Sequence, residues 1–196
     1  MCSPPLKLST SLLATVAVAL SSGDAFARGP VGVEVGAEAG YGTSPGGAAV
    51  NPLGLGVGGR AGLTLWGLYL GVEGVNYFGS PDGNGGQYHA VQFGGQLGYR
   101  IKISSVTIRP QVGVGDVYLF GSSAGVTSPA LPTALCLYTQ PGAVVFASFG
   151  ALYVGVDASA LLIVNEPAYV LSGSQYVFST SLTVAFTAHG QIGLKF

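Results

Sequence analysis

Residues 31–41 read VGVEVGAEAGY, in which apolar residues alternate with glycine or glutamate. Successive side chains of a β-strand point to opposite faces, so Val33 and Val35 share one face. Glu34 and Glu38 share the other, and a period of two does not suit an amphipathic helix. The same alternation recurs along the chain and predicts strands at about residues 31–42, 53–66, 68–79, 88–102, 105–120, 133–148, 151–164 and 176–196.

The surroundings of these strands follow from the composition. Only 8% of the 196 residues are charged, 33 are glycine, and the mean hydropathy is +0.54. Such a chain is too apolar for an ordinary soluble surface, which indicates a membrane protein. Its net charge of −1 offers no basic surface for a phosphate backbone, so a nucleic-acid partner is not expected.

A chain can cross a membrane as helices or as a closed barrel, because only these satisfy every backbone polar group without water. The best helical candidate is residues 143–164, AVVFASFGALYVGVDASALLIV. Gly150, Gly155 and Asp157 interrupt it, and it is rich in β-branched and aromatic residues, which favours strands. We therefore expect an all-β protein: an eight-stranded, antiparallel, up-and-down transmembrane barrel.

The connections between the strands alternate in length. Tight turns are predicted at Trp66-Gly67, Ile103-Ser104 and Phe149-Gly150. The other connections, TSPGGAAVNP, SPDGNGGQ, GSSAGVTSPALP and NEPAYVLSGS, are longer and predicted as loops. Short turns at one end and long loops at the other are typical of bacterial membrane barrels.

The first 27 residues differ from the rest. Lys7 precedes an apolar stretch at residues 12–20, and Ala25-Phe26-Ala27 has the small-x-small pattern of a cleavage site. We expect a cleaved signal peptide at residues 1–27 and one barrel domain at residues 28–196. Cys2 would leave with the signal peptide, so Cys136 would have no partner for an internal disulfide.

The chain from residue 28 to residue 196 resembles the small eight-stranded outer-membrane barrels of the OmpA/OmpX type, and its last strand, TVAFTAHGQIGLKF, is similar to their closing strand. The resemblance implies that Ile192, Leu194 and Phe196 form a signal read by the barrel assembly machinery. It also implies a bacterial outer membrane of the Gram-negative type, contact with outer-membrane lipid and lipopolysaccharide, and periplasmic chain ends. No external partner is indicated.

The inner face of the predicted barrel carries charges of both signs. We expect four acids and four bases to form an ion-pair network that closes the interior, because an unpaired buried ion is costly. A narrow gated channel for small solutes or ions, opened by exchange of partners, is the alternative. The predicted network consists of Glu34, Glu38, Arg60, Glu73, Arg100, Arg109, Asp157 and Lys195.

Catalysis is not expected. A lipid-modifying enzyme needs a nucleophile and a base within hydrogen-bond reach, and the only histidines, His89 and His189, have no serine on the same strand face within reach. The sequence shows no metal-ligand spacing and no cofactor motif. We therefore predict a non-enzymatic structural or surface protein, with a surface-binding protein or a lipid-modifying enzyme as less favoured alternatives.

The aromatic residues fall mostly near the predicted strand ends, which favours a girdle at the membrane interfaces. Leu131, Leu135 and Leu137 surround Cys136 and make that stretch unusually apolar, which leaves a partner surface, a lipid contact or another register open. The predicted girdle consists of Tyr41, Trp66, Tyr77, Phe78, Tyr118, Phe120, Tyr138, Phe149, Tyr176 and Phe178.

Overall fold

The computed structural model describes residues 31–43, 51–81, 86–123, 134–172 and 175–196. The predicted signal peptide lies outside these residues. No helix that is long and apolar enough to cross a membrane occurs in this part of the chain. The strands are β1 (Val31–Thr43), β2 (Gly54–Leu65), β3 (Leu68–Pro81), β4 (Gly86–Tyr99), β5 (Ile101–Ile103), β6 (Val106–Ser123), β7 (Ala134–Phe149), β8 (Leu152–Ser172) and β9 (Gln175–Lys195).

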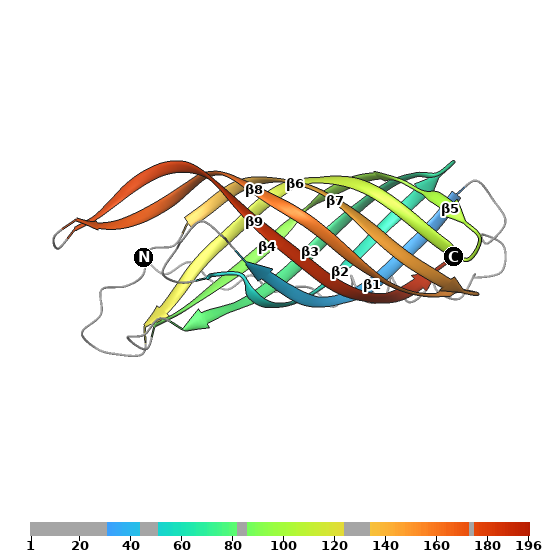
Figure 1. The fold of residues 1–196 in the computed structure, drawn as a ribbon, viewed down its shortest axis with the longest axis horizontal. Helices are drawn as coiled ribbons and strands as arrows, with labels where there is room; N and C mark the ends of the chain where they lie inside the picture. The colour runs from blue at the N-terminus through green and yellow to red at the C-terminus, as the bar shows by residue number, and fades with distance from the viewer. Residues whose placement is uncertain (1–30, 44–50, 82–85, 124–133, 173–174) are drawn as a thin grey trace, which may run out of the picture.

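All strand pairs are antiparallel, and the sheet closes on itself (Figure 1). The short β5 continues the line of β4 after Arg100, because both pair with β6. The wall therefore consists of eight strand positions, each paired with its neighbours in sequence, and β1 pairs with β9 to complete the ring. The prediction of an eight-stranded, antiparallel, up-and-down barrel is confirmed.

Three tight turns connect strands at one end of the barrel. Trp66 and Gly67 both have positive φ, 49° and 89°, which gives a two-residue hairpin whose twist matches that of the strands. The other two turns lie at Ser104-Ser105 and Gly150-Ala151, one residue later than the sequence predicted. Ser104 and Gly150 are the first residues of these turns and have positive φ, a conformation that glycine adopts readily.

The opposite end of the barrel is longer on one side. The sequence prediction of a loop over residues 165–174 is wrong, because β8 and β9 keep pairing up to Ser172 and Gln175. A register shift between Ile163 and Glu166 marks the start of this extension, which projects beyond the other strands (Figure 1). Inter-strand hydrogen bonds therefore satisfy a backbone that was expected to be irregular.

The described barrel begins and ends beside the tight turns. Val31 pairs with Leu65 next to the first turn, and the backbone N–H of Lys195 donates to the carbonyl of Ala151 at 2.7 Å. Both ends of the described barrel therefore lie on the same side.

The two faces of the wall have opposite chemistry. The outer face exposes aliphatic side chains from all the long strands, whereas the interior buries glutamate, arginine, glutamine and histidine. This reverses the arrangement of a soluble protein, in which apolar groups are buried. The large exposed outer residues include Leu55, Leu63, Leu70, Val72, Val114, Leu135, Leu137, Val156 and Ile192.

Apolar residues also fill the half of the interior nearer the long loops. Tyr77 and Tyr138, predicted in the outer girdle, are 0% and 2% exposed and belong to this inner cluster. The girdle prediction is wrong for both, because they share the inward face of their strands with Glu73 and Gln140. The inner cluster consists of Leu53, Val75, Tyr77, Ala90, Val117, Leu119, Cys136, Tyr138, Leu161, Ile163 and Ala185.

The rest of the predicted girdle divides into two groups. Tyr41, Trp66, Phe78, Tyr118 and Phe149 are exposed on the outer face, and Phe120 is half-buried there beside Tyr118. The side chains of Tyr176 and Phe178 lie outside the described residues, and so does Leu131 of the predicted apolar stretch around Cys136.

Candidate functional site in the barrel interior

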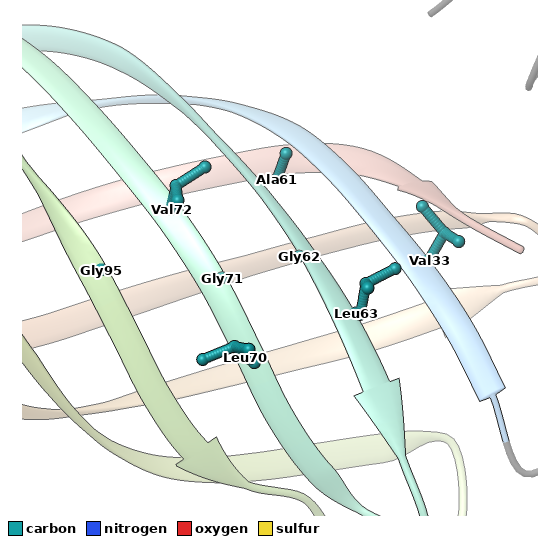
Figure 2. A pocket seen from close by; sticks show the side chains of 8 residues that line it. All are labelled: Val33, Ala61, Gly62, Leu63, Leu70, Gly71, Val72 and Gly95. Carbon is teal, nitrogen blue, oxygen red and sulfur yellow. The ribbon is translucent and has the colours of Figure 1, made fainter.

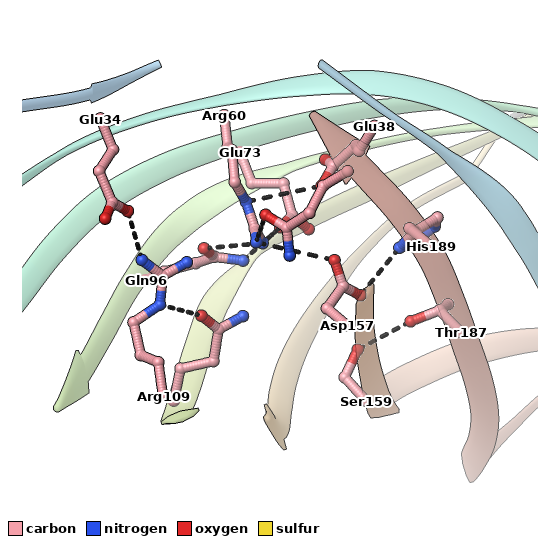
Figure 3. A network of polar contacts seen from close by, with 12 residues as sticks. Glu34, Glu38, Arg60, Glu73, Gln96, Arg109, Asp157, Ser159, Thr187 and His189 are labelled. Carbon is pink, nitrogen blue, oxygen red and sulfur yellow. Dashed lines mark hydrogen bonds and ion pairs between the residues drawn. The ribbon is translucent and has the colours of Figure 1, made fainter. Parts of the chain in front are cut away.

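Arg60 stands at the centre of the interior and faces three carboxylates (Figure 3). Its Nη2 donates to Oε2 of Glu73 at 2.6 Å, and the two residues are direct partners between β2 and β3. Its Nε lies 3.5 Å from Oε2 of Glu38, and its Nη1 lies 3.7 Å from Oδ2 of Asp157. This central cluster, Glu38, Arg60, Glu73 and Asp157, thus joins residues of β1, β2, β3 and β8.

Glutamine side chains connect the central cluster to the walls. Nη1 of Arg60 donates to Oε1 of Gln191 at 3.0 Å, and Gln96 donates to Glu73. Gln92 donates to Gln140 at 2.8 Å, and Gln140 donates to Ser159 at the same distance. The predicted network included only charged residues and therefore left out these glutamines, although the same alternation places them on the inner face.

His189 lies on β9 between the polar centre and the apolar inner cluster. Its Nδ1 is 3.1 Å from Oδ1 of Asp157, and its Nε2 is 3.0 Å from the hydroxyl of Tyr77. Ser159 instead shares a hydrogen bond of 2.8 Å with Thr187. The hydrogen bonds of the described residues thus pair His189 with a carboxylate and a phenol, and not with a serine nucleophile.

A second charged group lies nearer the tight turns. Nη1 of Arg109 donates to Oε2 of Glu34 at 2.5 Å, and Arg100 makes an ion pair with the same carboxylate. The guanidinium of Arg109 also stacks 3.6 Å from the ring centroid of Tyr69, a favourable cation–π contact. This turn-side cluster therefore holds two arginines against one acid.

Lys195 is the predicted network residue that stands apart. It takes part in none of the ion pairs formed among the described residues. Its Nζ lies 5.9 Å from the ring centroid of Phe146. The structure thus brings together seven of the eight predicted charges, in two clusters of opposite excess charge.

Glycines on the inner face make room for the large side chains. A Cβ added at Gly62 or Gly71 would overlap the ring of Tyr69, which is fully buried against Arg109. The narrow interior of an eight-stranded barrel can hold such side chains only where the facing positions are small.

The outer face has a hollow where two of its wall residues are small. Ala61 and Gly95 lie between larger neighbours, and the hollow has a volume of about 520 Å³ (Figure 2). Its rim consists of exposed aliphatic side chains, so it is an apolar recess in the outer wall. The residues lining it are Val33, Ala61, Gly62, Leu63, Leu70, Gly71, Val72 and Gly95.

The predicted assembly signal lies at the seam between β1 and β9. The backbones of Phe196 and Val33 exchange two hydrogen bonds, of 3.0 and 2.9 Å. Ile192 and Leu194 point outward on the same strand. All three residues therefore lie at the C-terminal end of the chain, where β9 pairs with β1 and completes the ring.

Comparison with protein-family models and with curated proteins finds no match. Among solved structures, the chain is similar to Neisserial surface protein A (NspA), with a TM-score of 0.53 and 13% identity over 86% of this chain and 98% of that chain. The N-terminal β-barrel domain of Pseudomonas aeruginosa OprF gives a TM-score of 0.49 and 12% identity, over 84% and 97%. Ail of Yersinia pestis, the attachment invasion locus protein, gives 0.46 and 13%, over 85% and 97%. The similarity to NspA confirms, as a likeness of fold, the resemblance to small eight-stranded outer-membrane barrels.

Proposed function

We propose that this protein is an integral outer-membrane barrel with a structural or surface role, whose interior is closed by its own side chains. The observation that carries this proposal is the reversal of the two faces, with aliphatic residues outside and ion pairs inside. An outer wall of this kind is stable against lipid acyl chains and not against water. The apolar hollow beside Ala61 and Gly95 suits contact with lipid, including the acyl chains of lipopolysaccharide.

Two layers support a closed interior. The apolar inner cluster occupies the half nearer the long loops, and the charged and amide side chains occupy the centre. An eight-stranded barrel has an interior that side chains can fill, in contrast to the water-filled channel of larger porins. A barrel packed in this way acts as a scaffold in the membrane rather than as an open pore.

The location follows from the same reasoning. A Gram-negative outer membrane, reached through a cleaved signal peptide and the barrel assembly machinery, is the environment in which barrels of this fold occur. The chain ends and tight turns would then face the periplasm, and the longer loops with the β8–β9 extension would face outward. No specific external partner is proposed.

A narrow gated channel is the second candidate, because Arg60 faces three carboxylates and could exchange among them. One experiment separates the two functions. The barrel is refolded, its closed state is checked by a gel mobility that changes on boiling, and single-channel currents are recorded in planar bilayers. A folded barrel that stays electrically silent supports the scaffold. Discrete openings that change in Glu73→Gln or Arg109→Gln would replace it with the channel.

A further inference from the structure

Three side chains of different strands converge beside the central arginine. Glu38 of β1, Asp157 of β8 and His189 of β9 each present a ligand atom, and these atoms all lie within 4.8 Å of one another. All three residues are buried. Figure 3 shows their side chains facing one another across the seam side of the interior. The three residues are far apart in the sequence, and they come together only when β1 pairs with β9 and the barrel closes.

Three of the four carboxylate oxygens of this group lack hydrogen bonds among the described residues. Both carboxylate oxygens of Glu38, which is 4% exposed, accept none from the described part of the chain, and neither does Oδ2 of Asp157. Their nearest cation is Arg60, at 3.5 and 3.7 Å, while its short hydrogen bonds go to Glu73 and Gln191. A buried acceptor without a donor is costly, so a further hydrogen-bond donor or a cation is expected at these oxygens.

The formal charges of the central cluster indicate the charge that a bound cation would need. With all three carboxylates ionised, Glu38, Glu73 and Asp157 carry three negative charges, and Arg60 supplies one positive charge. With a neutral imidazole at His189, the central cluster has an excess of two negative charges. A divalent cation would restore neutrality in a region where water cannot screen the excess.

We propose that Glu38, Asp157 and His189 bind a divalent transition-metal ion, with Zn²⁺ as the best match. Imidazole nitrogen and carboxylate oxygen are both zinc donors, and a zinc site with three protein ligands leaves the remaining position to water. Nδ1 of His189 faces Asp157 and would be the ligand atom. Nε2–H would then donate to the hydroxyl of Tyr77, at 3.0 Å, which fixes the tautomer and the ring orientation.

Such an ion would connect β1, β9 and β8 at the place where the ring closes. Glu38 pairs with Gln191 across the seam, and His189 pairs with Asp157 in the next ladder. Binding to the closed barrel alone raises its apparent stability, so added zinc should raise the temperature at which the gel mobility changes.

The test uses the full chain, refolded in detergent, freed of metal with a chelator and dialysed against Zn²⁺ alone. We expect one equivalent of bound zinc, and an affinity at least tenfold lower in His189→Gln and Glu38→Gln. His89→Gln and Cys136→Ser are the matched controls, because His89 is the other histidine and stacks on Phe120 outside the barrel, and Cys136 is a thiol of the inner cluster. Both controls should bind like the parent.

The absence of bound zinc in the folded parent would overturn the proposal, and so would zinc that is lost only with His89 or Cys136. If neither ligand variant folds, Co²⁺ bound to the parent decides the question. Its absorption should show ligand-field bands without a thiolate charge-transfer band, and X-ray absorption should show a single imidazole among oxygen ligands. A thiolate band, or no imidazole, would place the ion elsewhere and overturn the assignment.

Discussion

Arg60 and Glu73 face each other across the β2–β3 ladder and are joined by a hydrogen bond of 2.6 Å. They stand equally far from the centre of the Trp66-Gly67 turn, so the two-residue turn itself makes them partners. A local feature of the chain thus sets the shortest ion pair of the central cluster. Glu38 reaches Arg60 across the neighbouring β1–β2 ladder, whereas Asp157 of β8 reaches it only through closure of the barrel.

Replacement of Arg60 by methionine should destabilise the barrel by about 3–5 kcal/mol, because it leaves buried carboxylates without their cation. The measurement is the free energy of unfolding in urea, with the barrel in lipid vesicles. The double variant Arg60→Met with Glu73→Gln should be less destabilised than the sum of the single changes. A cost below about 1 kcal/mol would show that the pair lacks the strength of a buried contact.

Replacement of Gly62 by alanine should cost about 1–3 kcal/mol, because the added methyl group would overlap the ring of Tyr69. Gly74→Ala is the matched control. A Cβ there would meet only the carbonyl oxygen of Gln92, at 3.9 Å, so the change should have little effect or stabilise slightly. Equal losses in the two variants, measured by the same urea titration, would contradict the packing argument.

An arginine on the outer wall should have an effect that depends on depth. Val72 and Leu68 are 62% and 49% exposed on β3, but Leu68 adjoins the tight turn and Val72 lies farther along the strand. For a barrel in a bilayer, Val72→Arg should cost about 2–4 kcal/mol and Leu68→Arg about 0–1 kcal/mol. Unfolding in lipid vesicles measures both. Two equally small costs would argue against a membrane around this wall.

Replacement of Phe196 by alanine should reduce insertion into the outer membrane while leaving the folded barrel stable. The backbone hydrogen bonds to Val33 survive the change, and only the terminal aromatic group is lost. The assembled fraction is measured in cells by its heat-modifiable gel mobility, and stability is measured on the refolded barrel. Leu137→Ala, an outward leucine of β7, is the control. If both variants insert equally well, Phe196 is not an assembly signal.

The period of two was sufficient to predict the faces of the strands but not their partners. A turn displaced by one residue, as at Gly150-Ala151, shifts the β7–β8 register by two residues, so each side chain keeps its face and changes its neighbour. Contacts across the interior, such as Arg109 with Glu34, join residues 75 positions apart and depend on the closed ring. They could not be derived from local pattern.

The apolar inner cluster was missed for a different reason. Tyr77 and Tyr138 have the composition of an interfacial girdle, and only the continuous alternation from Glu73 and Gln140 places them inside. Their residue type indicates the membrane interface, whereas their position in the alternation indicates the interior, and the structure follows the alternation. The inner half of a small barrel is filled by whatever side chains match its width, polar or not.

The reversed faces of the wall also determine how the chain must fold. In water, hydrophobic collapse would gather Leu70, Val72 and their neighbours into a centre and leave Arg60 and Glu73 outside, which is the native order turned inside out. Collapse therefore opposes the native state until an apolar medium surrounds the strands. The apolar medium around the outer face therefore helps to determine the native structure, and the chain needs that medium when the ring closes.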